Sequence, residues 1–236
     1  MTRLTLYELA GADRALRFSP HCWKTRMALA HKGLEADRIP CWFTEKALIA
    51  FSGQTLVPIL VDGTESVHDS WHIALHLERH FPDRPTLFAA AAVPLTHFVN
   101  RWADTVLVPA LARIILQDIY RLLAPVDQPY FRQTREQRFG QRLEEVVADR
   151  AGHIADFRKT LAPLRQTLAL QPFLAGDAPA YADYCVFGMF MWARCVSTAD
   201  LLEDSDPVFA WRERLLDAFD GMARFAPSVP AAPDMG

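Results

Sequence analysis

The serine at position 19 is the first candidate for chemistry, because it precedes a proline at the start of a predicted helix. Ser19 is a favourable N-cap, and Pro20 is favoured at the first helical position. A hydroxyl there lies beside free backbone N–H groups at the positive end of the helix dipole, and these groups stabilise an anion. A thiolate is such an anion, and the same forces lower a thiol pKa from about 8.5 towards neutrality. Ser19 is therefore a candidate to hold a thiolate, although taken alone such a serine more often only caps its helix.

Two further pairs of residues indicate what kind of molecule would carry that thiol. Val57 and Pro58 lie in an apolar run that otherwise resembles a central strand, where proline is unfavourable because it lacks an N–H. A cis Pro58 would leave the backbone of Val57 free to pair with an extended peptide, and the alternative is an edge strand with an ordinary trans proline. Asp69 and Ser70 begin the next predicted helix. They either hold the charged end of an α-amino acid or form a simple N-cap pair.

Cys22 offers a competing chemistry. It follows Ser19 by three positions, the spacing of a thioredoxin-like pair whose first cysteine has become serine. Disulfide exchange through its thiol is therefore an alternative. One turn inside a helix, however, the sulfur more often points into the core.

Histidines recur every four residues at positions 68, 72, 76 and 80. The last three would form one stripe on a predicted helix, and imidazoles at this spacing can bind a transition metal. The stripe borders the core face of that helix and lacks the carboxylate of a recognised hydrolase motif. We therefore expect a solvated helix flank and no metal site.

The elements that position these residues follow an α/β pattern over the first 80 residues. Apolar alternation predicts strands at 4–9 and 39–43, and a hairpin is predicted for 56–61 with 64–68. Helices are predicted from Pro20 to the glycine at 33 and over about 70–80.

Helical spacing replaces the strand pattern from position 93 onwards. A long helix is predicted with apolar residues at 95, 98, 102 and 106 and a kink near Pro109. Further helices are predicted around 154–168 and after Asp206, and the almost wholly apolar segment 183–193 predicts a buried central helix. The polar stretch 124–150 is either a solvated helix pair or a mobile loop.

Aromatic residues recur at helical spacing in this half, which predicts core positions for them. Apolar ligands commonly bind at domain junctions, so a pocket between the two halves would be lined by some of these residues. The set consists of Phe98, Trp102, Phe187, Phe190 and Trp192.

Composition narrows the class of protein. The chain has 236 residues, of which 51% are hydrophobic, and a formal net charge of -3 without a long block of one sign, so neither a nucleic-acid surface nor a basic membrane patch is expected. No apolar run reaches the roughly 18 residues that a spanning helix needs, and the first residues lack signal-peptide features. The four cysteines suit a reducing compartment. We expect a cytoplasmic protein.

The three motifs occur in the order found in glutathione transferases. The chain resembles that family in residues 19–29 (SPHCWKTRMAL), at 57–58 and 69–70, and in residues 176–184 (GDAPAYADY). The resemblance implies a thioredoxin-like glutathione-binding domain at 1–82, a linker at 83–92, an all-helical domain at 93–226 and a tail at 227–236. Ala180 stands where the family usually has Ser or Thr, so Asp183 alone would cap the central helix.

The resemblance also implies roles for the candidate residues. Ser19 would activate the glutathione sulfur, Val57 would pair with the cysteinyl backbone before a cis Pro58, and the γ-glutamyl end would be held by Asp69 and Ser70. Some classes of the family use a tyrosine hydroxyl at the end of the first strand, so Tyr7 is the rival of Ser19.

Within the family, the opening Ser-Pro-x-x-Trp and the segments 127–131 (DQPYF) and 143–146 (LEEV) resemble bacterial glutathione-dependent β-etherases and related fungal enzymes. This similarity implies a homodimeric glutathione S-transferase that uses glutathione as co-substrate and no metal. Its acceptor would be an apolar or aromatic electrophile such as a β-aryl ether. The alternatives are a non-catalytic glutathione-fold ligand-binding protein and a thiol oxidoreductase acting through Cys22.

Overall fold

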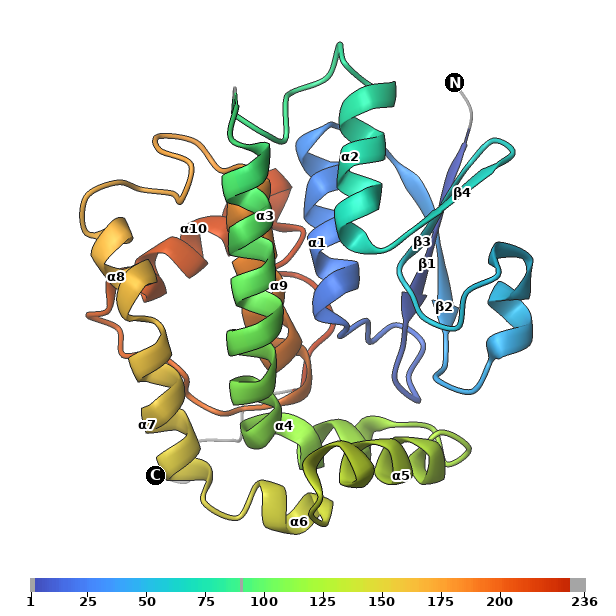
Figure 1. Ribbon diagram of the computed structural model, residues 1–236, viewed down its shortest axis with the longest axis vertical. Helices are drawn as coiled ribbons and strands as arrows, with labels where there is room; N and C mark the ends of the chain where they lie inside the picture. The colour runs from blue at the N-terminus through green and yellow to red at the C-terminus, as the bar shows by residue number, and fades with distance from the viewer. Residues whose placement is uncertain (1–2, 90, 230–236) are drawn as a thin grey trace.

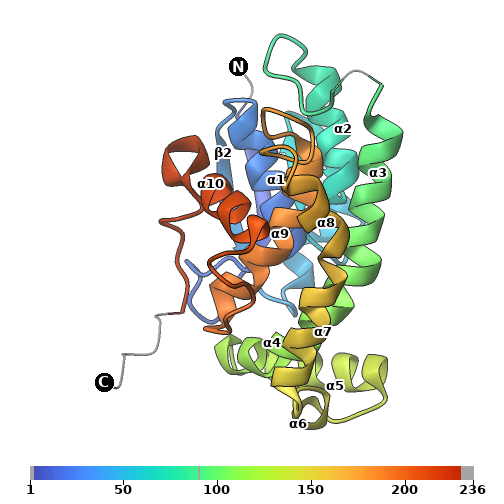
Figure 2. The same cartoon turned by 90° about the vertical axis from the view of Figure 1, so that its left-hand side faces the viewer.

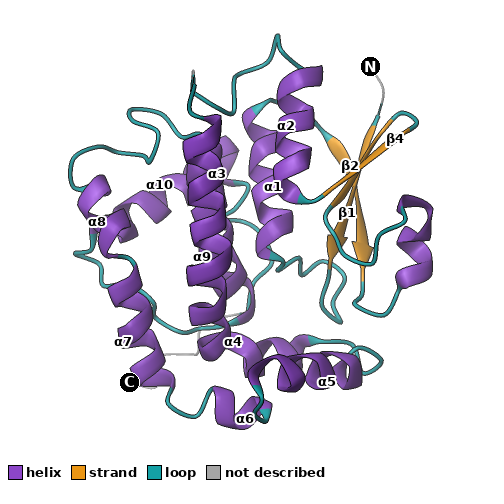
Figure 3. Ribbon diagram, in the orientation of Figure 1, coloured by secondary structure: helices purple, strands orange, loops and turns teal. Residues whose placement is uncertain are grey.

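A four-stranded mixed sheet with two helices on one face forms the N-terminal part of the chain, and helices alone form the rest (Figures 1 and 3). The computed structural model describes residues 3–89 and 91–229. The N-terminal elements are β1 (Leu4–Leu9), α1 (Pro20–His31), β2 (Ala36–Cys41), a 3-10 helix (Lys46–Ser52), β3 (Ile59–Asp62), β4 (Glu65–His68) and α2 (Ser70–His80). This architecture confirms the expected thioredoxin-like N-terminal domain.

The sheet topology brings the ends of three strands together at one end of the sheet. The strand order is β2-β1-β3-β4, with β1 and β2 parallel and β3 antiparallel to β1. The C-terminal ends of β1 and β2 therefore lie at the same end of the sheet as the N-terminal end of β3, because Ile59 pairs with Tyr7. The predicted strand at 56–61 starts only at Ile59, since Pro58 cannot donate a ladder hydrogen bond.

The rest of the chain is helical, as predicted. Its elements are α3 (Val93–Trp102), a π-helical segment (Ala103–Leu107), α4 (Val108–Leu122), α5 (Gln128–Phe139), α6 (Leu143–Val146), α7 (Arg150–Thr160), α8 (Ala162–Leu168), α9 (Tyr181–Val196) and α10 (Pro207–Gly221). The ambiguous stretch 124–150 forms the helix pair α5 and α6. Among the described residues, every helix is too short or too polar to cross a bilayer. The predicted tail at 227–236 falls outside the described residues from 230 onwards.

The long helix predicted after position 93 has a different buried face from the one expected. Leu95 and Phe98 are 73% and 70% exposed, whereas Thr96 and Asn100 are buried. Asn100 is buried because its side chain accepts a hydrogen bond from a lysine of α1, so the apolar pattern misled the prediction of which face packs. Near the predicted kink at Pro109, the backbone widens into the π-helical segment, which ends two residues before this proline; Pro109 has no N–H for a regular helical bond, and α4 runs in a different direction from α3 (Figures 1 and 2).

Helix α9 lies against α1 and so connects the helical part to the sheet-bearing part (Figure 2). Gly188 permits this contact, because a Cβ there would lie 2.5 Å from the carbonyl oxygen of Pro20. The fully buried Lys24 adds a polar connection: its Nζ donates to Asn100 Oδ1 at 2.7 Å and to Asp104 Oδ1 at 2.6 Å. Both contacts fix the first turn of α1, which carries Ser19 at its cap.

Candidate active site

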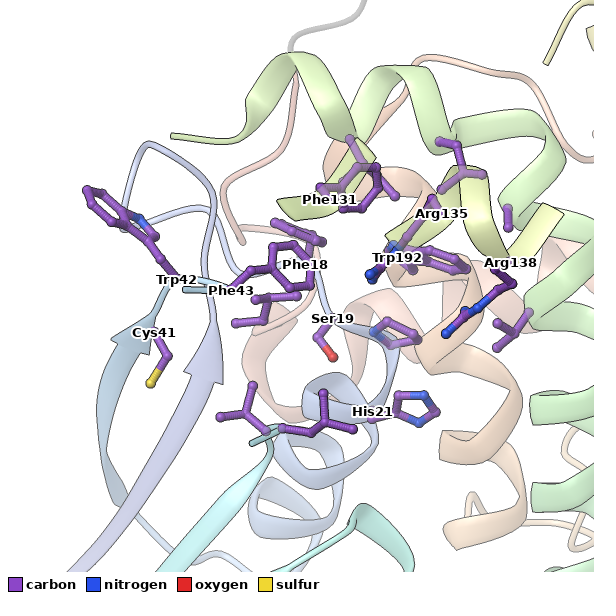
Figure 4. Close-up of a pocket in the computed structure, with 18 of the residues that line it drawn as sticks. Phe18, Ser19, His21, Cys41, Trp42, Phe43, Phe131, Arg135, Arg138 and Trp192 are labelled. Carbon is purple, nitrogen blue, oxygen red and sulfur yellow. The ribbon is translucent and has the colours of Figure 1, made fainter. Parts of the chain in front are cut away.

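A cavity of about 620 Å³ opens between the edge of the sheet and helices α4 and α5 (Figure 4). Its walls are mainly apolar and aromatic. The sheet-bearing part contributes Phe18, Ser19, His21, Phe43 and Val57, and the helical part contributes Asp104, Ala112, Leu116, Phe131, Arg135, Arg138 and Trp192. A cavity with apolar walls and few polar groups at a domain junction is typical of a small-molecule site.

Ser19 lies at the N-terminus of α1 and lines this cavity. Its Oγ accepts a long hydrogen bond of 3.4 Å from the Cys22 backbone N–H. No acceptor for its hydroxyl hydrogen is found among residues 3–89 and 91–229. Figure 4 shows the oxygen directed into the space between Phe43 and His21. Ser19 can therefore donate a hydrogen bond to an anion held at the end of α1.

The charged groups beside Ser19 are already paired with one another. His21 Nδ1 lies 3.7 Å from Asp104 Oδ1, which also accepts from Lys24. Partial desolvation at the cavity wall, where 40% of the His21 side chain is exposed, lowers the pKa of His21, and the neighbouring Lys24 charge lowers it further. The lowered pKa favours the neutral imidazole, and the Lys24 charge is paired with Asp104, so the Ser19 hydroxyl and the N-terminus of α1 are left to favour a negative sulfur.

The other residues predicted to bind glutathione meet at the same end of the sheet. Val57 lines the cavity, and the Val57-Pro58 bond is cis. Since Ile59 pairs with His68, the hairpin brings Pro58 and Asp69 to the same end. Asp69 lies outside the cavity wall, where its carboxylate accepts from the backbone N–H groups of Trp71 and His72 and caps α2.

Ser70 is the least accessible member of the predicted set. It is buried at the start of α2, and its carbonyl oxygen accepts a 2.6 Å hydrogen bond from the Tyr181 hydroxyl. The structure thus places Ser19 and Val57 on one cavity wall and Asp69 and Ser70 beside it.

The two rival residues lie in less favourable surroundings. Cys22 is buried, and this burial raises the pKa of its thiol to about 12, so little thiolate exists at neutral pH. Tyr7 packs against Cys41, Ile49 and Ile59; Cys41 and Ile49 line the cavity, but Tyr7 itself does not. Of the three candidates, Ser19 alone lines the cavity.

The predicted histidine stripe has a structural arrangement that the sequence did not indicate. His76 is buried rather than solvated, because its Nε2 lies 3.0 Å from Asp62 Oδ2 and ties α2 to the hairpin. Ligand atoms of Glu65, His76 and His80 lie within 4.8 Å of one another, whereas His72 lies beside Asp69 instead. Within this cluster, His76 uses its Nε2 for the bond to Asp62, and its Nδ1 lies 3.8 Å from Glu65 Oε1.

The aromatic residues predicted to line a pocket separate into three groups. Trp192 lines the cavity. Phe187 and Phe190 pack against Trp211 in the core, and the half-buried Trp102 packs against the same core, whereas Phe98 faces outwards. Other wall residues were missed by the sequence analysis: Phe18, Phe43, Phe131, Arg135 and Arg138. For α5 a signal existed, since 131, 135 and 138 are spaced four and three apart and so share one helix face.

Two family models match this chain, and known structures share its fold. The family model described as Glutathione S-transferase, N-terminal domain matches residues 15–85, and the one described as Glutathione S-transferase, C-terminal domain matches residues 94–219. Glutathione transferase GSTFuA3 from Phanerochaete chrysosporium is 25% identical over 90% of this chain and 96% of its own, with a TM-score of 0.78. The glutathione S-transferase CsGST63524 of Ceriporiopsis subvermispora, solved in complex with glutathione, is 24% identical over 98% of this chain and 100% of its own, with a TM-score of 0.82.

A bacterial enzyme shares the fold at lower identity. The β-etherase LigF from Sphingobium sp. strain SYK-6 is 19% identical over 92% of this chain and 96% of its own, with a TM-score of 0.64. The two family models together match most of the chain, in the order of its two structural parts. The chain belongs to the glutathione S-transferase family.

Proposed function

We propose that this protein is a glutathione transferase in which the Ser19 hydroxyl stabilises the thiolate of bound glutathione. The observation that carries the proposal is the position of Ser19, whose hydroxyl caps α1 and faces a cavity also lined by Val57. Glutathione binding is supported by the complex of the similar Ceriporiopsis subvermispora protein. In this proposal Val57 pairs with the cysteinyl backbone before Pro58, and the γ-glutamyl end binds at Asp69 and Ser70.

The reaction would be nucleophilic substitution. The thiol proton leaves to solvent, the thiolate sulfur forms a bond to an electrophilic carbon, and the leaving group departs with the electrons of the broken bond. For an aryl halide the leaving group is halide. For a β-aryl ether it is an aryloxide, which then takes a proton from water. Holding both reactants in one cavity supplies the orientation on which such a reaction depends.

The apolar walls favour an apolar or aromatic acceptor. Phe18, Phe43, Phe131 and Trp192 surround the space in front of Ser19. Cleavage of β-aryl ethers is the finer proposal, supported by the sequence resemblance and by the shared fold of the bacterial β-etherase.

Turnover tests this proposal. Incubation with glutathione and either chlorodinitrobenzene or a β-aryl ether should give the glutathione conjugate, detected by absorbance and mass spectrometry. Cys22→Ala should retain this activity, because the Cys22 thiol is buried with a raised pKa. Heat on mixing with glutathione but no conjugate from any acceptor would favour a non-catalytic binding protein. Activity that disappears with Cys22 would favour the oxidoreductase.

We also propose a cytoplasmic homodimer with domains at 1–82 and 93–226. Leu95 and Phe98 lie three residues apart on α3 and expose most of their apolar surface, which a second copy would cover. Light scattering should give the mass of two chains for the wild type and of one chain for Phe98→Glu. A monomeric wild-type protein would contradict the dimer without affecting the site.

A further inference from the structure

Helix α5 presents an alternating aromatic and cationic face to the cavity. Phe131, Arg135, Arg138 and Phe139 all line it and recur at helical spacing on one side of the helix. From α4, the exposed Arg113 adds a third guanidinium group to the cavity wall, with its Cζ 5.4 Å from the centre of the Phe139 ring. In Figure 4 the side chains of Arg135 and Arg138 extend from α5 towards the space above Ser19 and His21.

The charges of these three arginines are not paired with carboxylates of residues 3–89 and 91–229, unlike the charge of Arg132 on the outer side of α5. Arg132 lies within 2.8 Å of carboxylate oxygens of both Glu136 and Glu144, so its charge is neutralised within the protein. Within the part of the chain that the structure describes, no carboxylate lies within ion-pair distance of Arg113, Arg135 or Arg138. The polar bond found for Arg135 goes to the neighbouring Thr134 hydroxyl.

Arg135 is held in surroundings that disfavour an uncompensated charge. Its guanidinium stacks at 4.6 Å from the Phe131 ring centre and 5.1 Å from that of Phe43. Burial and the nearby charge of Arg138 lower the pKa of Arg135 to about 10. The aromatic faces compensate part of this cost, and an anion placed between the two arginines would compensate the rest.

The cavity has almost no negative charge of its own that could compensate the charges of these arginines. Asp104 is the one acidic side chain among the residues that line it, and that carboxylate already accepts from Lys24 beside Ser19. The helical wall is therefore cationic as well as aromatic. Lys46 adds one cation from the sheet-bearing part, where its Nζ donates to the carbonyl oxygen of Thr55, whereas the three arginines lie on the helical side that faces the acceptor substrate.

We propose that the acceptor substrate of this enzyme is an aromatic carboxylate, whose ring packs among Phe43, Phe131 and Trp192 and whose carboxylate is bound by Arg135 and Arg138, with Arg113 of α4 also on the cavity wall. The inference rests on the proposed transferase function. A guanidinium group matches a carboxylate with two parallel hydrogen bonds, which a neutral acceptor cannot provide. Binding the anion at α5 would turn the electrophilic carbon towards the thiolate at Ser19.

A matched pair of acceptors tests this specificity. A chlorodinitrobenzoate and its neutral amide have the same ring and the same chloride leaving group, and differ in the carboxylate. We expect the wild type to prefer the benzoate in kcat/KM, and Arg138→Gln to lose about 10- to 100-fold for the benzoate, as expected for one charge-assisted interaction, with little change for the amide. Arg135→Gln should behave similarly. Arg138→Lys should recover part of the preference, and Arg132→Gln, on the outer side of α5, should keep all of it.

The outcomes separate this inference from the proposed function. Equal kcat/KM for both acceptors in the wild type would overturn the inference and leave the transferase intact. A rise in the KM for glutathione with both acceptors in Arg138→Gln would also overturn it, because the arginines would then hold glutathione's own carboxylates. If neither acceptor reacts, calorimetry with dinitrobenzoate and dinitrobenzamide still decides: tighter binding of the anion that is lost in Arg138→Gln supports the inference, and equal binding contradicts it.

Discussion

Replacing Ser19 with alanine should reduce kcat/KM at neutral pH by about 10- to 100-fold and move the pH profile of the reaction to higher pH by about one to two units. A hydrogen bond to a charged group contributes about 1.5 to 3 kcal/mol, and one pKa unit corresponds to about 1.4 kcal/mol. On the proposed mechanism this bond lowers the thiol pKa of bound glutathione in the wild type, so thiolate would be abundant at neutral pH. Without the hydroxyl the pKa rises, and at high pH, where both proteins hold thiolate, the difference should become small.

The measurement is an ultraviolet thiolate titration of bound glutathione together with kcat/KM against pH. Ser19→Thr, which keeps a hydroxyl, should retain much of the shift. Because Ser19 also caps α1 through a bond of 3.4 Å to Cys22 N, a loss of stability of about 1 kcal/mol or less is expected and is measured separately by urea unfolding. An unchanged thiol pKa in Ser19→Ala would remove Ser19 from the reaction.

Replacing Asp183 with alanine should destabilise the protein by about 3 to 5 kcal/mol. The Asp183 carboxylate is fully buried and accepts from Leu174 N at 2.8 Å, Ala180 N at 3.0 Å and Trp211 Nε1 at 2.8 Å. Each buried donor left without an acceptor costs about 1 to 3 kcal/mol. The loss of all three would loosen the N-terminus of α9, the loop before it and α10 together.

Urea unfolding followed by tryptophan fluorescence measures this effect. Asp183→Asn keeps one oxygen as acceptor and should lose less stability than the alanine variant. Asp177→Ala, at an exposed position six residues earlier, should change the unfolding free energy by about 0.5 kcal/mol or less. An alanine variant at 183 as stable as the wild type would show that these three donors find other partners.

The fold was largely predictable from local patterns. Ser19 with Pro20, Asp69 before Ser70 and Asp206 before Pro207 each mark a helix start that the structure confirms. These features are readable because a cap acts on its own first turn and needs no distant partner. The role foreseen for Asp183 at the N-terminus of α9 is confirmed for the same reason, although its bond to Trp211 was not visible in the sequence.

The wrong predictions concern residues whose burial depends on contacts with residues far away in the sequence. Phe98 was assigned to the core on its spacing, but the buried face of α3 contains Asn100, whose partner Lys24 lies 76 residues earlier. His76 was expected on a solvated flank and is buried by its bond to Asp62. Polar residues that pair across elements cannot be recognised from the periodicity of one helix.

In the cavity, too, one wall was predicted from local motifs and the other was not. Ser19 and Val57 were identified as candidates from motifs, and the structure places both on one wall. The opposite wall on α5 was missed because the stretch 124–150 has many charges and no dominant apolar stripe. Only the structure distinguishes the arginines of α5: Arg132 is paired with carboxylates on the outer side, whereas Arg135 and Arg138 line the cavity.

A crystal structure of the protein with bound glutathione tests the central claim most directly. The proposal predicts the sulfur within hydrogen-bond distance of the Ser19 hydroxyl and the cysteinyl backbone paired with Val57. A sulfur placed beside Tyr7 or Cys22, or glutathione bound outside this cavity, would contradict it.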